Sequence, residues 1–424
     1  MSYISDLLPR RSDYVDLRKV WRHDVIAGIT VGIVALPLAL AFGITTGAGA
    51  RAGLITAVYA GFIAAIFGGS NYQVSGPTGA MTVVLIPIVI KYGSASLAPL
   101  GLVAGAIVIF MGVTHCGGLI KRVPWPVMEG FTLGIALVIA LQQLPSVLAA
   151  KSVSGANTLI TAWRTLHSAF SAGVHWSSIV ILVITLVVKF AYPKISRALK
   201  IKIHIPASFV AILVATLLVS IFSIHTPLIG NLPRSLYAHV SLSKSNIGMS
   251  ALLIGAIQIA LLAAIESLLS ARVADQMVHI HESAQSYKPN RELVGQGLAT
   301  MVSSMVGGMP ATGAIARTSV NIRSKAASRI SSISHAVFLL LVVLVLNPVI
   351  AHIPTAALGA VLIGTSYRIA NPGNIMEMLK TTRLDATTLL VTAALVVVIG
   401  LIWAIAISTA GYVIATIVLK NVKK

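Results

Sequence analysis

The stretches "GGSNYQVSGPTGAMT" (68–82) and "GGMPATGAIARTS" (307–319) repeat one pattern at two distant places in the chain. Each begins with a glycine pair, continues through a short gap to Thr-Gly-Ala, and then resembles the start of a helix. Only the second copy carries a guanidinium, that of Arg317. Apolar sequence surrounds both copies, so a polar motif and a cation stand in a hydrophobic setting that has to be explained.

The composition is that of a membrane protein. Of the 424 residues, 57% are hydrophobic and 10% are charged, whereas a soluble domain has about 25% charged residues. Apolar runs of roughly 18 residues or more recur along the chain, and each can cross a bilayer as a helix. The first run follows a charged head and lacks a small-residue cleavage site, so it is expected to be a span and not a signal peptide. The sequence therefore predicts an all-α polytopic membrane protein.

We place about 14 transmembrane segments along the chain. Their expected bounds are 24–46, 51–68, 77–92, 97–118, 124–145, 175–192, 205–224, 251–277, 292–306, 313–328, 332–351, 354–370, 386–403 and 405–419. With the N-terminus in the cytoplasm, most of the 31 Lys and Arg residues fall in cytoplasmic segments, as the positive-inside rule requires. This predicts a multi-pass protein of the cell membrane with both termini cytoplasmic.

The same charge distribution argues against a nucleic-acid partner. The net charge of +20 is spread over short loops and is not concentrated on one soluble module, as a nucleic-acid-binding domain would require. The single cysteine, Cys116, excludes an internal disulfide. No metal-ligand cluster, cofactor motif or nucleophile–base pair is present, so we expect no metal, no cofactor and no enzyme activity.

The two copies occupy matching places in the two halves of the chain, because one follows the second expected span and the other follows the ninth. Two halves with seven spans each insert in opposite orientations and form inverted repeats, a transporter architecture with its substrate near the midplane at broken helices. We expect half-helices in spans 3 and 10, with Pro77 and Pro310 in their first turns. Their unpaired N–H groups would attract an anion. For either copy alone, an ordinary short loop is the alternative.

Arg317 suits such a site. A cation within a bilayer costs on the order of 2.5–3.5 kcal/mol, and this one lies about one turn into a half-helix expected to begin near Gly313. The guanidinium stays protonated and presents a planar fork that fits carboxylate, sulfate or bicarbonate. The alternative is an arginine that extends to the membrane interface.

Glu266 is a second charge within an apolar span, "IQIALLAAIESLLSARVADQM" (257–277). A lone carboxylate in lipid is protonated or paired, and Ser270 lies on the same helical face at i+4. Glu266 can pair with Arg317 and exchange a proton as an anion binds, or bind sodium together with Ser270. A static ion pair is the third possibility.

Four motifs resemble the sulfate permease (SulP) family of anion transporters over nearly the whole chain. They are "DVIAGITVGIVALPLALAFG" at 24–43, "SGPTGAMTVV" at 75–84, "NRELVGQG" at 290–297 and "GAIARTSVNIRS" at 313–324. The resemblance implies 14 segments in two inverted seven-span repeats, a core domain, a gate domain and a homodimer. The implied division is a head at 1–23, core segments at 24–118 and 251–351, gate segments at 124–224 and 354–419, and a tail at 420–424.

The resemblance also implies a substrate pocket between spans 3 and 10, beside spans 1 and 8. The implied substrate-binding residues are Leu38, Phe42, Thr78, Gly79, Ala80, Gly313, Ala314, Ile315, Ala316, Arg317 and Thr318. The implied coupling-ion residues are Glu266, Ser270 and Arg317.

The pair of Glu266 and Arg317 resembles the proton-coupled sulfate symporters of the family. Sodium-coupled bicarbonate members combine the acid with a small residue in span 10, and chloride exchangers or channels often lack the acid. We therefore expect a secondary active transporter of a small anion (sulfate, bicarbonate or a dicarboxylate), with proton symport and an elevator-like core movement. A sodium-coupled bicarbonate symporter and an uncoupled channel or exchanger are the alternatives.

Three features depart from the family pattern. Members usually carry a cytoplasmic STAS domain after the last span, whereas this chain stops at "LKNVKK", so a membrane domain without STAS is expected. Lys325 stands where the family usually has Gly, and Gly400 stands where many members have Asp.

Overall fold

The computed structural model describes residues 6–9, 17–118, 123–150, 158–173, 175–200, 205–230, 245–278 and 287–422. The first half contains α2 (Leu17–Thr45), α3 (Ala50–Phe67), β1 (Ser75–Gly76), α4 (Gly79–Tyr92), η2 (Ser94–Ser96), α5 (Leu97–Val113), α6 (Trp125–Gln142), α7 (Leu144–Leu148), α8 (Thr158–Ala172), α9 (Trp176–Ala198) and α10 (Ala207–Ile221). The second half contains α11 (Met249–Val278), α12 (Pro289–Met305), β2 (Thr312–Gly313), α13 (Ile315–Arg323), α14 (Ile330–Ala351), α15 (Thr355–Ala370), α16 (Pro372–Leu379), α17 (Arg383–Ile399) and α18 (Leu401–Val422).

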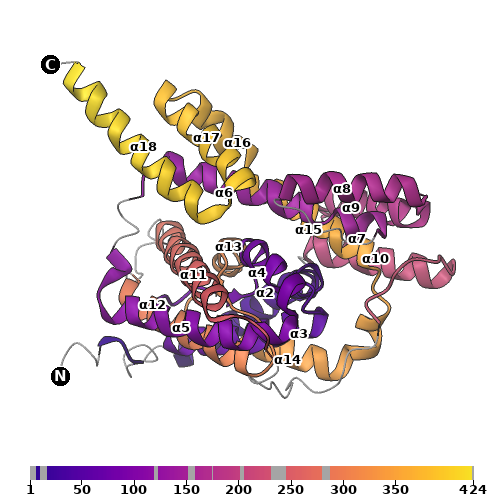
Figure 1. Cartoon of the computed structure of the whole chain (residues 1–424). Helices are drawn as coiled ribbons and strands as arrows, with labels where there is room; N and C mark the ends of the chain where they lie inside the picture. The colour runs from indigo at the N-terminus through magenta and orange to yellow at the C-terminus, as the bar shows by residue number, and fades with distance from the viewer. Residues whose placement is uncertain are drawn as a thin grey trace.

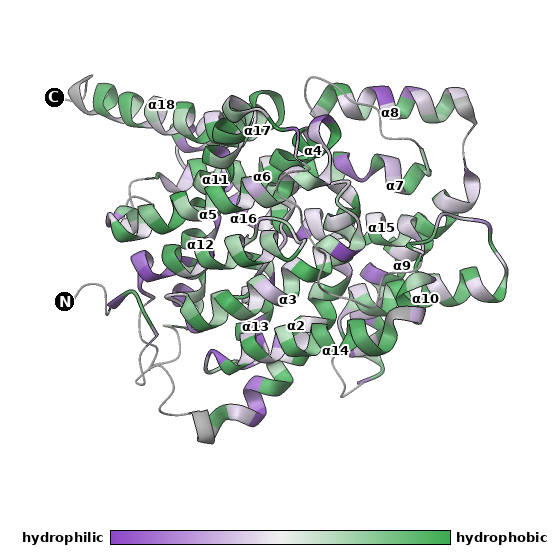
Figure 2. Cartoon of the chain, turned by 60° about the horizontal axis from the view of Figure 1, so that its bottom comes forward, coloured by the Kyte–Doolittle hydropathy of each residue, from purple (hydrophilic) through white to green (hydrophobic). Residues whose placement is uncertain are grey.

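Many of these helices have the length and composition of membrane spans. Within the described residues, 7 helices are long and apolar enough to cross a bilayer, and three shorter apolar helices accompany them. In Figure 2 the hydrophobic colour predominates along the helices. The polytopic helical architecture is confirmed, while the count of about 14 spans in inverted repeats stays a prediction.

The described helices extend beyond the expected spans in several places. Helix α2 begins at Leu17, inside the expected head 1–23, because the helix continues into the charged sequence before the apolar run. Two described helices, α8 and α16, lie where no span was expected. Of the expected head and tail, residues 1–5, 10–16, 423 and 424 lie outside the described residues.

The helices gather into two groups (Figure 1). In one group α5 packs against α11 and α12, while α14 packs against α2 and α3, with α4 and α13 toward the middle of the molecule. In the other, α6 packs against α15 and α17, and α9 packs against α10 and α15. The first group contains the helices expected in the core and the second those expected in the gate. Their behaviour as a moving core and a fixed gate stays a prediction.

Small residues let α5 and α12 approach closely, as is usual between helices in membranes. A Cβ atom added at Gly105 would lie 2.6 Å from the Gly297 carbonyl oxygen, and one added at Gly297 would lie 2.6 Å from the Gly105 carbonyl oxygen. The two backbones are therefore in direct contact, and neither position has room for a side chain.

Two of the departures from the family pattern sit at unusual backbone positions. Lys325, just after α13, has φ +65°, and Gly400, between α17 and α18, has φ +92°. Glycine takes such conformations without steric cost, which explains why a glycine is usual at the first position. Nothing in the described structure explains why a lysine occupies this position.

Substituting Gly105 by Ala is expected to destabilise the protein by about 1–3 kcal/mol, the usual cost of forcing atoms into a packed interior. Gly411→Ala is the matched control, because Gly411 is also within a helix and an added Cβ meets nothing within 4 Å. Helix propensity makes that control neutral or mildly stabilising. Thermal unfolding in detergent should show a lower midpoint for Gly105→Ala only; equal midpoints would contradict the close packing.

Candidate functional site

The two repeated motifs lie side by side as a short antiparallel ladder. Strand β1 pairs with β2, with Ser75 opposite Gly313 and Gly76 opposite Thr312. The half-helices α4 and α13 begin just after these strands. The sequence prediction that the two copies meet is therefore confirmed, and the ladder places both helix N-termini at one location.

The prediction that prolines occupy the first turns of the half-helices is wrong. Thr78 caps α4, its side chain accepting from the Met81 N–H at 3.4 Å, so Pro77 precedes the cap. Helix α13 begins at Ile315, and Gly313 belongs to β2. The Ala314 N–H donates to the Val74 carbonyl at 3.0 Å and prolongs the pairing beyond β2. The chain stays extended through this contact, which delays the helix past Pro310 and Gly313.

Glu266, on α11, connects the two copies. Its Oε2 atom accepts one hydrogen bond from the Thr78 hydroxyl at 2.8 Å and another from the Thr312 hydroxyl at 2.7 Å. The next residue, Ser267, accepts from the Gly313 N–H at 3.0 Å. Thr78 and Thr312 are the threonines of the two Thr-Gly-Ala units, so equivalent residues of the repeat bind one carboxylate oxygen.

Arg317 is buried beside the ladder, with 1% of its surface exposed. Its Nη2 donates to the Pro77 carbonyl oxygen at 2.8 Å, and its Nη1 has no hydrogen-bond partner among the described residues. A Cβ at Gly76, where φ is +153°, would lie 2.5 Å from Nη1, so a side chain there would displace the guanidinium. The alternative that Arg317 extends to the membrane interface is wrong, because the side chain turns inward to the first copy.

The direct ion pair between Glu266 and Arg317 that the sequence allows is not formed in the described structure. The carboxylate oxygen is occupied by the two threonine hydroxyls, and the guanidinium by the Pro77 carbonyl. The two charged groups therefore line one site without forming an ion pair, and each can form a further hydrogen bond.

Ser270 and Thr318 lie behind the site. The Ser270 hydroxyl donates to the Thr318 hydroxyl at 3.2 Å, and that oxygen also accepts from the Val74 N–H at 3.1 Å. Both side chains are buried. In this arrangement Ser270 serves the packing of α11 against α13 and does not join Glu266 at the cavity.

A cavity of about 100 Å³ lies at the two helix N-termini. Its lining contains all the other residues that the resemblance implied: Leu38, Phe42, Thr78, Gly79, Ala80, Glu266, Gly313, Ala314, Ile315, Ala316 and Arg317. We call it the central cavity. Because one water occupies about 30 Å³ in the liquid, this cavity is large enough for a small ion with few water molecules.

The sequence patterns did not point to the opposite wall of the central cavity. It consists of residues from α6 and α15: Phe131, Thr132, Ile135, Ile139, Thr365 and Ile369. These come from apolar helices without a motif, so no local signal marks them. Thr312 was missed as well, although its equivalence to Thr78 in the repeat could have identified it.

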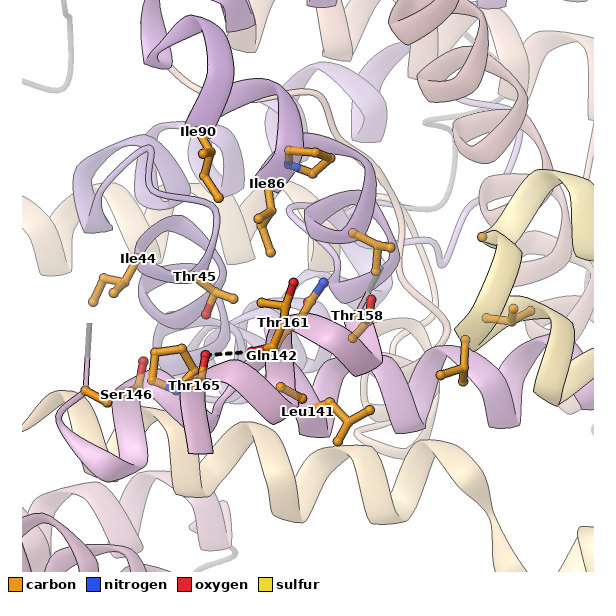
Figure 3. A pocket seen from close by; sticks show the side chains of 18 of the residues that line it. Ile44, Thr45, Ile86, Ile90, Leu141, Gln142, Ser146, Thr158, Thr161 and Thr165 are labelled. Atoms are coloured by element: carbon orange, nitrogen blue, oxygen red, sulfur yellow. Dashed lines mark hydrogen bonds between the residues drawn. The ribbon is translucent and has the colours of Figure 1, made fainter. Parts of the chain in front are cut away.

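Two larger cavities lie between the helix groups. One, of about 750 Å³, is shown in Figure 3, where hydroxyl and amide side chains from α2, α6, α7 and α8 surround it. We call it the threonine-lined cavity; its polar lining includes Thr45, Gln142, Ser146, Thr158, Thr161 and Thr165.

The second of these larger cavities, of about 580 Å³, is lined by residues of α2, α9, α13 and α15 and contains Arg197, Lys200 and Arg368. We call it the basic cavity.

The electrostatics of the central cavity favour a negative ligand. The first N–H groups of α4 and α13 lack acceptors within their helices and carry a partial positive charge. Arg317 adds a full charge in the same wall, while Glu266 opposes it. Most of the remaining lining is apolar, which leaves these charges weakly screened.

Comparison with known proteins identifies the family. The model of the sulfate permease family matches residues 21–392. This chain belongs to that family. It is 35% identical to the putative sulfate transporter YvdB of Bacillus subtilis over 399 residues, which are 91% of this chain and 72% of YvdB. It is 30% identical to the bicarbonate transporter BicA of Picosynechococcus over 355 residues, 80% of this chain and 60% of BicA.

Solved structures share the fold. The transmembrane domain of a cyanobacterial bicarbonate transporter BicA superposes with a TM-score of 0.79 at 29% identity, covering 91% of this chain and 97% of that domain. The murine anion transporter Slc26a9 in the inward-facing state gives 0.82 at 16% identity, covering 99% of this chain and 72% of that one. The relatives are transporters and not enzymes, and this protein is a helical membrane protein of their family.

Thr312→Val is expected to cost about 1–2 kcal/mol, because it removes one of two donors to a buried carboxylate. Thr312→Ser, which keeps the hydroxyl, should retain most of the stability. Thermal unfolding in detergent measures both. In a Glu266→Gln background the cost of Thr312→Val should fall, since the partner is then neutral; a cost that does not depend on residue 266 would contradict the shared hydrogen bond.

Proposed function

We propose that the protein is a secondary active transporter of a small oxyanion of the sulfate or bicarbonate class, with the anion held in the central cavity. The observation that supports this most directly is the meeting of two helix N-termini and the Arg317 guanidinium around one small space. Nη1 of Arg317 lacks a hydrogen-bond partner among the described residues and is the donor that an anion would engage. The names of YvdB and BicA agree with this ligand class.

The proposed topology is 14 spans in two inverted repeats, with both termini in the cytoplasm and a homodimer as the assembly. In that orientation the threonine-lined cavity faces the outside and the basic cavity faces the cytoplasm. The core, with spans 1–4 and 8–11, moves against the gate of spans 5–7 and 12–14 and carries the central cavity between the two sides. An elevator-like movement of this kind needs a bistable interface between the groups.

Proton coupling follows from the charges. Ionised Glu266 lies in the lining of the same cavity as the anion and repels it, whereas protonated Glu266 does not. Binding of a proton and binding of the anion therefore favour each other, and this reciprocity is the thermodynamic basis of symport. The arrangement differs from a direct exchange of partners between Glu266 and Arg317, because the two side chains do not pair in the described structure.

Arg317→Ala is expected to lower anion affinity about ten- to a hundredfold, because it removes charge-assisted hydrogen bonds that are worth roughly 1.5–3 kcal/mol. Arg323→Ala, at the other end of α13, is the matched control and should bind normally. Binding of sulfate and of bicarbonate to the purified protein measures the effect. Normal affinity in Arg317→Ala would remove the site proposal.

Glu266→Gln is expected to retain anion binding and to lose the response to a proton gradient, since the amide imitates the protonated acid permanently. In proteoliposomes, an acidic exterior should accelerate sulfate or bicarbonate uptake by the unaltered protein and leave the variant unaffected. Glu129→Gln, which changes a carboxylate of α6 outside the cavity lining, should keep the response.

Uptake that requires sodium and ignores pH would establish a sodium symporter, and large currents without accumulation would establish a channel.

A further inference from the structure

Lys189 is a buried cation on α9 that the proposed mechanism does not use. Only 4% of its surface is exposed, and the sequence around it, "VILVITLVVKF" (180–190), is apolar. A charge at such a position costs on the order of 2.5–3.5 kcal/mol, and intramembrane charges mark functional sites by default. Lys189 lies on a helix of the gate group, whereas Arg317 lies on α13 in the core group.

Among the described residues, the ammonium of Lys189 donates hydrogen bonds only to α15. Its Nζ donates to the Val361 carbonyl oxygen at 2.6 Å and to the Thr365 hydroxyl at 2.8 Å. Gly364 makes the space, because a Cβ there would lie 2.8 Å from the Lys189 Cδ atom. Within the residues that the structure describes, both acceptors are neutral and no carboxylate pairs with the ammonium, so its charge is not cancelled locally.

Thr365 connects this cation to the central cavity. Its hydroxyl donates to the Val361 carbonyl at 2.7 Å and accepts from Lys189, and Thr365 is one of the residues that line the cavity. One residue, Thr365, therefore both binds the ammonium and lines the space where the anion is proposed to bind. The cavity has Arg317 in one wall and, behind Thr365, Lys189 in the other.

We propose that Lys189 is a positioning residue of the anion site which, acting through the Thr365 hydroxyl, makes the gate wall positive and favours divalent over monovalent oxyanions. The inference rests on the proposed function of the central cavity. Coulomb energy is proportional to the product of the charges, so the same ammonium stabilises a dianion about twice as strongly as a monoanion. The positive charge of Lys189 also offsets the negative charge of Glu266 when that carboxylate is ionised.

A purely structural role makes a different prediction. If Lys189 only joins α9 to α15, its loss lowers stability and the maximum rate equally for every substrate. If it adds charge to the site, its loss raises KM for a dianion more than for a monoanion and leaves the maximum rate less affected. The ratio of the two KM values therefore separates the roles.

The experiment compares Lys189→Met with the unaltered protein in proteoliposomes, with sulfate as the dianion and bicarbonate as the monoanion. An anion that is not itself transported is measured as a competitor. For a roughly threefold rise in the bicarbonate KM, the doubled energy predicts about a ninefold rise for sulfate. Lys189→Arg should keep the preference, and Lys194→Met, which removes an exposed lysine from the same helix, should change neither value.

Thr365→Val tests the connection and remains informative if Lys189→Met does not fold. It keeps the shape of the side chain and removes the hydroxyl that holds the ammonium beside the cavity, so it should shift the sulfate-to-bicarbonate KM ratio in the same direction as Lys189→Met. The double variant should add little to either single change, because both act through one contact.

Equal KM changes for the two anions, or a Thr365→Val protein with the original ratio, would overturn the role of Lys189. Failure of the unaltered protein to bind or move either anion would instead overturn the proposed function.

Discussion

One oxygen atom of Glu266 receives hydrogen bonds from two threonines that lie 234 positions apart in the chain, Thr78 and Thr312. Everything else at the site depends on this shared contact. Thr78 caps α4, and Thr312 lies in β2 three residues before α13 begins, so holding both to one carboxylate holds both helix N-termini near each other. The ladder between Ser75 and Gly313 supplies the backbone contacts of the same junction.

Such a junction has a high free-energy cost unless its polar groups form hydrogen bonds, because extended backbone within a membrane has no water to bind. The structure satisfies it with the ladder, with Ser267 accepting from Gly313, and with Arg317 donating to the Pro77 carbonyl. What remains are the first N–H groups of the two helices beside the central cavity and, on Arg317, an Nη1 atom without a hydrogen-bond partner among the described residues. In the proposed function the anion completes this set, and the carboxylate that assembles the site also makes its affinity depend on a proton.

The repeated motif made much of this junction predictable. A glycine pair, a Thr-Gly-Ala unit and a single arginine were enough to predict that the two copies meet, and most of the implied binding residues line the cavity. The start of α13 was not predictable, because the pairing of Ala314 with Val74 prolongs the extended segment through a contact between distant residues. The cavity wall formed by α6 and α15 could not be predicted either. Apolar residues such as Ile135 and Ile369 have the same side chains as residues that face lipid, and only their position in the folded protein distinguishes them. Arg317 and Glu266 were both recognised as buried charges, yet their separate partners come from the tertiary arrangement and not from spacing.

The central claim is that an anion and a proton bind to this junction together, with Glu266 as the proton acceptor. The most direct test is the number of protons taken up from a weakly buffered solution when sulfate or bicarbonate binds to the purified protein in detergent, with the proton exchange of bicarbonate itself subtracted. The account predicts uptake of up to one proton per bound anion over the pH range in which Glu266 is ionised in the free protein and protonated in the anion-bound protein, and none in Glu266→Gln at equal anion occupancy. Anion binding without proton uptake, or uptake that persists in Glu266→Gln, would contradict it.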